Sequence, residues 1–295
     1  MKLLSFGEIV WDVQDENVSL GGAPLNLAVH TAMQGEDALL VSAVGNDKLG
    51  RKAVRAAESY GVDTEFVSVL DDMETVVCTV TVGDMGTPSY ELMGHSSFDC
   101  IAVPVIDEYV DIIAFGTLSL RHENNRGVIR RMLERIPHSE VFCDINLRAP
   151  FYSVETIKYC LSNATLLKVS SEELPEVSRL VLGEYRDIES AVCGLHGEYP
   201  SIKLFIITLG SDGSLCFDSR GGQYYRSDAK KTDVLSTVGA GDSFSAAFLA
   251  CYMKGKCIGD CLEYASEISS MVCADKAAFS KEMEARINQI KGGKA

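Results

Sequence analysis

The stretch Ser236-Thr237-Val238-Gly239-Ala240-Gly241-Asp242-Ser243-Phe244 organises the interpretation of the whole chain. A β-like run, 231–235, leads into it. Behind it, apolar residues recur at spacings of three and four, as on one face of a helix: Phe244, Ala247, Phe248, Cys251 and Tyr252. The pattern predicts a strand, a glycine turn and the start of a helix.

This glycine turn has the features of an anion site. Glycine lets the backbone turn tightly and lets an anion approach the bare amides. The first amides of a helix have no internal partner, and the helix dipole is positive there. Asp242 adds a carboxylate, which is useful beside a transferring phosphate if it orients a hydroxyl and takes its proton. The glycines alone are equally consistent with an alternative interpretation, in which the segment is an ordinary tight turn and Asp242 is a residue of the first helical turn.

The string Thr-Val-Gly-Ala-Gly-Asp-Ser-Phe, residues 237–244, resembles the C-terminal signature of the ribokinase-like (PfkB-type) sugar kinases. The resemblance implies that Asp242 is the catalytic base and that the amides of Gly239, Ala240 and Gly241 form the anion hole. At a helix N-terminus Asp242 should be a weak base. The sequence contains no G-x-x-x-x-G-K-[ST], and no G-x-G-x-x-G follows a strand. Neither a Walker A loop nor a Rossmann dinucleotide site is therefore indicated.

Composition limits the class of protein. The 295 residues, 46% of them hydrophobic, suit one large α/β domain over 1–295 with a small lid inserted in it. A net charge of −15 argues against a nucleic-acid partner. Glu8 and Asp12 follow the first apolar residues too soon for a signal peptide, and no apolar run could span a membrane. None of the ten cysteines sits in C-x-x-C, so we expect free thiols and a cytoplasmic protein.

The N-terminal region supplies candidate sugar ligands. Residues 3–10 predict a buried strand, and in open α/β sheets ligands bind beyond the strand ends. Asp12 is therefore placed to bind a polar substrate, where family fructokinases carry a sugar-binding Asp; a plain loop carboxylate is the alternative. Gly21-Gly22-Ala23-Pro24-Leu25-Asn26 then opens a helix, 25–33, and resembles the family's N-terminal G-G-x-x-x-N signature. The resemblance implies that Gly22 and Asn26 contact the sugar.

A small antiparallel sheet is predicted by the period-two pattern of residues 75–82 and the return at 89–93, with a turn at 83–86. With residues 13–20, the segment 63–98 should form a lid, which in the family covers the sugar and often makes a dimer interface. The apolar even-numbered face of 76–82 needs a neighbour to pack on, so we expect a homodimer. Burial against the chain's own core, or an edge extension of the main sheet, are the alternatives.

From residue 110 to 182, strands and helices alternate, which predicts a parallel sheet covered on both faces and fits a ribokinase-like three-layer α/β/α fold. Asp144-Ile145-Asn146-Leu147-Arg148 ends one strand and resembles the D-x-N-x-R of fructokinases and 2-keto-3-deoxygluconate kinases. The resemblance implies that Asn146 and Arg148 contact the acceptor, and a guanidinium can donate two parallel hydrogen bonds. A surface salt bridge is the alternative for Arg148.

Residues 208–213 resemble the family's T-x-G-x-x-G, which implies that Thr208, Gly210 and Gly213 hold the nucleotide with Thr237, while the helix 258–274 flanks the adenine. Two departures concern metal ions. Glu173 matches the Glu of N-x-x-E, a motif linked to magnesium, but Ser170 replaces its Asn and leaves the magnesium arrangement in doubt. Ser236 replaces an Asp that helps bind a monovalent cation, so potassium activation is doubtful.

The expected function is ATP- and Mg²⁺-dependent phosphorylation of a sugar hydroxyl by a fructokinase-like enzyme. One alternative is a kinase for 2-keto-3-deoxygluconate or a nucleoside; a nucleoside would want an aromatic slot beside Asp12, which Trp11 could supply. An alternative of another class is a non-catalytic sugar-binding protein on a kinase scaffold, supported by Ser170 and Ser236 alone.

Overall fold

A nine-stranded sheet forms the centre of the computed structural model, which describes residues 1–14, 17–82, 88–92 and 96–293. All neighbours from β5 to β11 are parallel, and the last two strands add an antiparallel edge. The expected mostly parallel sheet is therefore confirmed. In spatial order the strands are β13 (Gln223–Ser227), β12 (Ser214–Asp218), β11 (Leu204–Thr208), β10 (Leu166–Ser170), β9 (His138–Asp144), β8 (Val110–Gly116), β1 (Lys2–Phe6), β4 (Asp37–Gly45) and β5 (Val67–Leu70).

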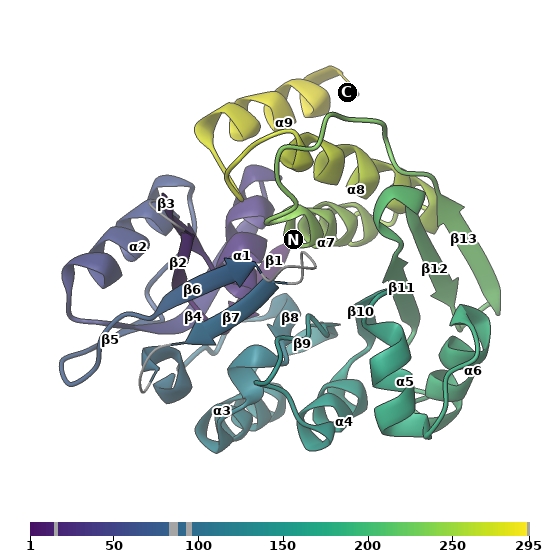
Figure 1. Ribbon diagram of the computed structural model, residues 1–295, viewed down its shortest axis with the longest axis horizontal. Helices are drawn as coiled ribbons and strands as arrows, with labels where there is room; N and C mark the ends of the chain where they lie inside the picture. The colour runs from purple at the N-terminus through teal and green to yellow at the C-terminus, as the bar shows by residue number, and fades with distance from the viewer. Residues whose placement is uncertain (15–16, 83–87, 93–95, 294–295) are drawn as a thin grey trace.

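Helices cover both faces of this sheet (Figure 1). Successive strand residues point to opposite faces, so Leu3 joins one apolar core and Leu4 the other. One face carries α1 (Ala23–Met33), α2 (Lys48–Ser59), α7 (Ala240–Tyr252), α8 (Ile258–Cys273) and α9 (Lys281–Gly293). The other carries α3 (Glu123–Arg135), α4 (Val154–Asn163), α5 (Leu174–Leu182) and α6 (Ile188–Glu198). The three-layer arrangement is as the alternating pattern predicts.

The expected first strand over 3–10 is two strands. β1 stops at Phe6, and β2 (Val10–Gln14) leaves for a second sheet. Gly7 makes the break: its φ is +147°, and a Cβ there would lie 2.5 Å from Pro24 Cγ. The apolar run predicted burial correctly but could not show that the chain changes sheets.

The second sheet has the order β3-β2-β6-β7, with β3 (Asn17–Gly21), β6 (Val77–Val82) and β7 (Pro88–Leu92). The predicted turn at 83–86 lies outside the described residues. The segment 63–98 also contains β5 and a short 3₁₀ turn, η1 (Ser97–Cys100), neither of them in this sheet.

Val76 and Cys78, on the even-numbered face predicted for residues 76–82, point inward. Cys78 pairs with Asp12 across β6 and β2, and Val76 and Cys78 are each only 3% exposed within one chain. The side chains at 80 and 82 are not among those described. The part of this face that the structure describes is therefore covered by the chain itself.

The run 231–235 is not a strand. It belongs to a loop between β13 and α7, and Val234 and Leu235 are 61% and 62% exposed. Leu235 N–H donates to the carbonyl of Cys273 at the end of α8, 2.8 Å away. This loop therefore runs beside the end of a helix and not beside the edge of a sheet, so its backbone has no neighbouring strand to pair with.

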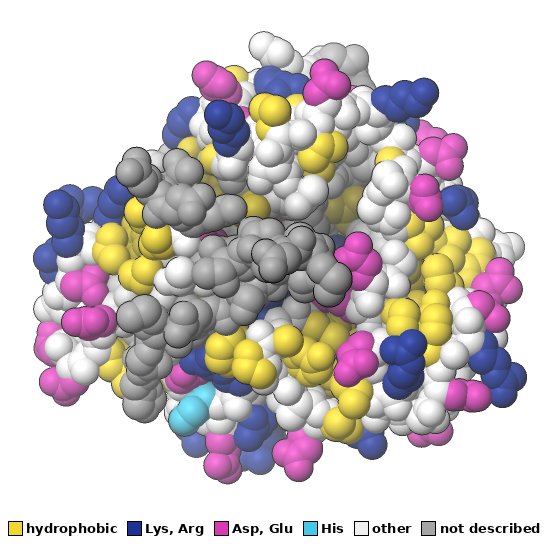
Figure 2. Space-filling model, in the orientation of Figure 1, with side chains coloured by type: hydrophobic (Ala, Val, Ile, Leu, Met, Phe, Trp, Pro, Cys, Tyr) yellow, Lys and Arg dark blue, Asp and Glu magenta, His cyan; other side chains and the backbone are white. Residues whose placement is uncertain are grey.

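Charged side chains of both signs are scattered over the face shown in Figure 2, without a basic patch. This distribution fits the acidic composition. Among the helices of the described ranges, none combines the length and apolarity needed to cross a bilayer.

Candidate active site

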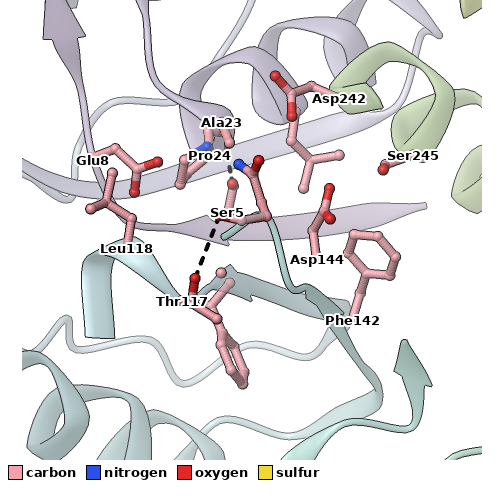
Figure 3. Close-up of a pocket in the computed structure, with 14 residues that line it drawn as sticks. Ser5, Glu8, Ala23, Pro24, Thr117, Leu118, Phe142, Asp144, Asp242 and Ser245 are labelled. Atoms are coloured by element: carbon pink, nitrogen blue, oxygen red, sulfur yellow. Dashed lines mark hydrogen bonds between the residues drawn. The ribbon is translucent and has the colours of Figure 1, made fainter. Parts of the chain in front are cut away.

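A small cavity opens at the carboxyl end of β1 and β8, where the strand order reverses direction, the usual place for a ligand in such sheets. Two buried hydroxyls fix its walls. Ser5 Oγ donates to Pro24 O and Thr117 Oγ1 to Ile145 O, each over 2.7 Å. Figure 3 shows the labelled carboxyls facing this space. The lining includes Glu8, Thr117, Phe142, Asp144, Asn146, Asp242 and Ser245.

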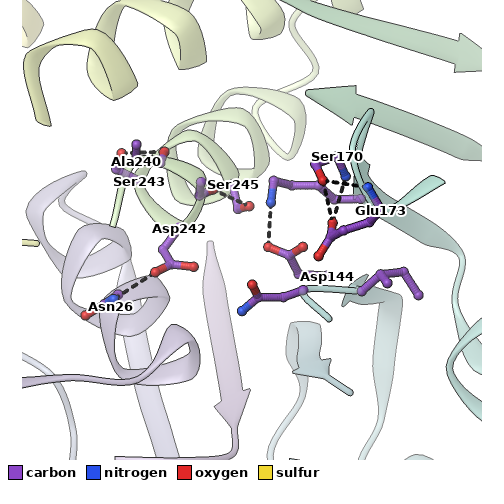
Figure 4. A network of polar contacts seen from close by, with 12 residues as sticks. Asn26, Asp144, Ser170, Glu173, Ala240, Asp242, Ser243 and Ser245 are labelled. Atoms are coloured by element: carbon purple, nitrogen blue, oxygen red, sulfur yellow. Dashed lines mark hydrogen bonds and ion pairs between the residues drawn. The ribbon is translucent and has the colours of Figure 1, made fainter. Parts of the chain in front are cut away.

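The two glycine-rich signatures meet at Asp242. Gly239, with φ +78°, starts α7, and Asp242 lies in its first turn. Asn26, in the first turn of α1, donates from Nδ2 to Asp242 Oδ2 over 2.7 Å. The two side chains point toward one another in Figure 4. A single hydrogen bond thus joins residues that lie at opposite ends of the chain.

The first turn of α7 is held rigidly. The carbonyl of Ala240 accepts hydrogen bonds from Ser243 Oγ at 2.9 Å and from Ser269 Oγ of α8 at 3.0 Å. Ala240 N–H donates to Thr237 O at 3.2 Å, whereas the Gly241 amide, in the first turn, has no intrahelical acceptor. Of the three amides predicted to bind an anion, that of Ala240 already has a partner.

Burial raises the pKa of the Asp242 carboxyl above its ordinary value. The Asn26 hydrogen bond and the charges of Lys168 and Arg148 lower it, but by less. Burial therefore acts against the weakening of this base that is expected at a helix N-terminus.

Glu8 and Asp12 share the surroundings of Arg148. Burial raises the pKa of both carboxyls, and the Arg148 guanidinium opposes that rise in each. Glu8 also accepts a hydrogen bond from Ser119 Oγ. Three carboxyls, Asp242 included, thus lie within the electrostatic reach of Arg148.

The Gly21-Gly22 pair is required by close backbone approach. A Cβ at Gly21 would lie 2.6 Å from Asp12 Oδ2, and one at Gly22 would lie 2.4 Å from the Glu8 carbonyl. Gly22 also has φ +114°, which other residues rarely adopt. The pair brings the strand carrying Asp12 against the start of α1.

Hydrogen bonds to the Glu173 carboxylate connect the turn after β9 to the turn after β10. Glu173 Oε1 accepts from Leu147 N at 2.6 Å, and Oε2 accepts from both Ser170 N and Ser170 Oγ at 2.9 Å. Asn146 in the first turn has φ +41°, and Arg148 Nη1 donates to Leu147 O at 3.1 Å. Glu173 and Ser170 therefore shape the loop that presents Asn146 and Arg148.

A larger cavity gathers every residue that was predicted to bind nucleotide. α8, predicted to flank the adenine, borders it through Ser270 and Cys273. Asn146 and Arg148, predicted to bind the acceptor, line it as well; Asn146 lines both cavities, whereas Arg148 lines only the larger one. The other predicted residues in its wall are Thr208, Gly210, Gly213, Thr237, Ala240, Gly241 and Glu173.

Three charged residues of the site were not among the predicted ligands: Glu8, described above, and the pair of Lys168 and Asp144. Lys168 Nζ donates to Asp144 Oδ2 over 2.6 Å, and the side chains are only 8% and 14% exposed. The signal in the sequence is Lys168 itself, because a lysine flanked by Leu166, Leu167 and Val169 is seldom buried without a partner.

Comparison with known proteins identifies the family. Residues 2–285 match the model of the pfkB family of carbohydrate kinases. The chain belongs to this family. The kinase fold is ribokinase-like: the fructokinase of Vibrio cholerae O395 with bound fructose, ADP and calcium has a TM-score of 0.80 at 20% identity, covering 96% of this chain and 98% of that one.

Relatives of established name agree with this membership. The probable fructokinase-4 of Arabidopsis thaliana is 29% identical over 275 residues, or 84% of this chain and 81% of the relative. The aminoimidazole riboside kinase of Salmonella typhimurium is 25% identical, over 92% of this chain and 91% of the relative. The kinase is a phosphotransferase with an alcohol group as acceptor.

Proposed function

We propose that this kinase transfers the γ-phosphoryl group of ATP to a hydroxyl of a neutral, unphosphorylated sugar, as a fructokinase does. The observation that carries the proposal is the position of Asp242. Its buried carboxylate is held by Asn26 in the wall of the small cavity, in the same first turn of α7 as the Gly241 amide, which has no intrahelical acceptor.

In this proposal Asp242 accepts the proton of the attacking hydroxyl. Its raised pKa makes it a better base than an ordinary carboxylate. The amides of Gly239, Ala240 and Gly241 hold the transferring phosphoryl group, and the Ala240 amide must exchange its present bond to Thr237 O for a phosphate oxygen.

The charge of the small cavity favours a neutral acceptor. Its described lining contains the carboxyls of Glu8, Asp144 and Asp242 and no lysine or arginine. The charge of Arg148, which lies outside this lining, already lowers the pKa of Glu8, Asp12 and Asp242. A carboxylate or phosphate on the acceptor would meet like charge, so fructose is favoured over 2-keto-3-deoxygluconate.

A nucleoside acceptor has less support, because Trp11 does not line the acceptor site. Trp11 is 3% exposed, its Nε1 donates to Leu49 O at 3.2 Å, and the Lys52 ammonium lies 4.6 Å from its ring. Neighbouring residues of a strand point to opposite faces, so Trp11 points away from the side of Asp12. The aromatic slot that a base would need is therefore not supplied by Trp11.

We propose Mg²⁺ as the metal of the bound nucleotide. Mg²⁺ usually keeps several waters and takes one or two carboxylates together with phosphates. Asp144 Oδ1 is buried without a hydrogen-bond partner, and Glu173 keeps about one lone pair, on Oε1, beyond the three bonds it accepts. These two carboxylates fit such a role, and the ion would neutralise the charge of the phosphates.

The test of the function is ADP release with a panel of acceptors: fructose, ribose, 2-keto-3-deoxygluconate, adenosine and a blank without acceptor. We expect the highest kcat/KM with fructose. A higher kcat/KM with 2-keto-3-deoxygluconate or adenosine would show that the assignment of fructose is wrong and would identify that compound as the acceptor. No acceptor-dependent release, with sugar binding retained, would support the non-catalytic alternative.

Arg148→Ala should raise the KM for the sugar far more than the KM for ATP, because Arg148 is the cation facing the three carboxyls of the acceptor side. Initial rates with each substrate varied in turn measure this. Arg220→Ala is the control, since Arg220 pairs with Asp218 over 2.8 Å at the other edge of the sheet and should change neither KM. An equal rise in both KM values would assign Arg148 to the phosphates or the fold.

We further propose that the kinase is a homodimer joined through its small sheet, and that it works in the cytoplasm, where its ten free cysteines stay reduced. Val76 and Cys78 face inward and cannot contact a second subunit. We therefore assign the dimer contact to the opposite face of the small sheet. On that face Val13 pairs with Val18, and Val18 is 56% exposed. Val18→Asp should then shift a dimer toward monomer in light scattering at micromolar concentration. A monomeric wild-type protein would reject the proposal.

A further inference from the structure

Lys168 occupies the junction of the two cavities. It lies on β10 directly beside Asp144 of β9, in register. Lys168 and Gly241 both line the larger cavity, and Asp144 lines both cavities. A Cβ built on Gly241 would lie 3.3 Å from Lys168 Nζ, so the ammonium rests against the backbone of the first turn of α7. Figure 4 shows Asp144 between the α7 start and the Ser170–Glu173 turn.

The ion pair of Lys168 with Asp144 is not needed to build the sheet. A buried ion pair loses hydration, and apolar residues of similar volume are often as stabilising. The neighbours Leu167 and Val169 are buried in an apolar core. An ammonium has three donors, of which Asp144 Oδ2 takes one at 2.6 Å. The lysine therefore retains donors for another acceptor.

The site also needs a cation at this point. The first turn of α7 carries an acidic residue, Asp242, and no basic one. A phosphoryl group held there would face Asp242 and Asp144 at close range. Lys168 supplies that cation, because its Nζ forms an ion pair with Asp144 Oδ2 over 2.6 Å and lies against Gly241.

We propose that Lys168 is a catalytic residue whose ammonium binds the oxygens of the transferring phosphoryl group, and that Asp144 is the positioning residue that holds it against Gly241. The inference rests on the proposed site of that group at the start of α7. During transfer the bond from phosphorus to the ADP oxygen breaks and the bond to the sugar oxygen forms. The hydroxyl proton goes to Asp242, and Lys168 keeps its protons throughout.

Lys168→Met should lower kcat by about 10²–10³, the loss seen when one donor to a developing oxyanion is removed. The loss of binding affinity should be confined to nucleotides that carry a γ-phosphate. We expect the Kd of ADP to stay within about threefold and that of the analogue AMP-PNP to rise about tenfold, equivalent to roughly 1.4 kcal/mol. Isothermal titration calorimetry with each nucleotide and MgCl₂ measures both values.

Two further variants separate chemistry from stability. Lys168→Met leaves Asp144 buried without its cation, which alone can destabilise the fold. Lys168→Met with Asp144→Asn removes both charges and should recover thermal stability while kcat stays at least about 10²-fold below wild type. Because Asp144 is also proposed to bind Mg²⁺, Asp144→Asn alone is the reference, and the double variant should have a lower kcat than that single variant. Lys203→Met is the matched control: Lys203 pairs with Glu140 of β9 over 2.9 Å at the opposite end of the same strand, and should keep wild-type kcat.

A double variant with wild-type kcat would overturn the proposal, since the lysine would then serve only to neutralise Asp144. Equal weakening of ADP and AMP-PNP would also overturn it, because the ammonium would then not act on the γ-phosphate. If the wild-type protein transferred phosphate to no acceptor, the proposed function would fail. The nucleotide titrations would still decide the role of Lys168.

Discussion

Asp242→Asn should lower kcat by about 10²–10⁴, the usual contribution of a positioned base, with little change in the KM of either substrate. Asparagine fits the same position, because its amide oxygen can still accept the hydrogen bond from Asn26 Nδ2. Fold and ATP binding should therefore be nearly intact. Steady-state kinetics, with circular dichroism as the test of folding, measure the effect.

The pH dependence gives a second readout on the same variant. Burial raises the pKa of Asp242, so its proton returns at a higher pH than for an ordinary carboxyl. The wild-type kcat should fall on the acid side as the base is protonated, and the residual rate of the Asn variant should lack that decline.

Asp187→Asn is the control for this variant. Asp187 is also an aspartate at a helix start, where it accepts from Ser190 N at 2.7 Å, but it caps α6 away from the site. Its kcat should equal that of the wild type. A folded Asp242→Asn variant that kept more than about a tenth of wild-type kcat would reduce Asp242 to a helix-capping residue.

Gly239→Ala should lower kcat by about 10²–10³, as loss of an oxyanion donor does. A Cβ at this position would lie 2.8 Å from Ala278 Cβ and 2.9 Å from its Cα. Ala278 cannot readily yield, because its carbonyl is hydrogen-bonded to the buried His30 Nε2 at 2.8 Å. The start of α7 must therefore shift and carry its amides out of position.

Gly183→Ala controls for the backbone cost of the same substitution. Gly183 ends α5 with φ +83°, close to the +78° of Gly239, and a Cβ there meets nothing within 4 Å. Both variants should lose roughly 1–3 kcal/mol of unfolding free energy through strain at positive φ. Only Gly239→Ala should lose activity; equal kcat in the two would show that the position of these amides does not matter.

The sequence predicted the parts of the site that depend on local backbone chemistry. Glycines at 22 and 239 occur where the chain has positive φ or meets another backbone, and such constraints are visible in the residue type. The alternation of strands and helices likewise predicted the parallel sheet and its two covered faces. The family signatures implied that Asn26 contacts the sugar and that Asp242 is the base, but the hydrogen bond between them was not predicted.

Partners across the sheet could not be predicted in the same way. An apolar run indicates that a segment is buried but does not indicate which strand it pairs with. Residues 3–10 were therefore predicted as one strand, although the chain changes sheets after Phe6. Residues 231–235 were predicted as a strand, although they form a loop. The inward direction of Cys78 depends on its pairing with Asp12. The ion pair of Lys168 and Asp144 depends equally on strand register.

The most direct test of the account is a phosphorus NMR spectrum of the wild-type kinase with fructose and MgATP, because ADP release alone does not separate transfer to a sugar from hydrolysis. We expect a sugar-phosphate resonance that grows in step with ADP, and no such growth in Asp242→Asn over the same period. Inorganic phosphate in place of sugar phosphate would contradict the account, as would undiminished transfer by the Asp242→Asn variant.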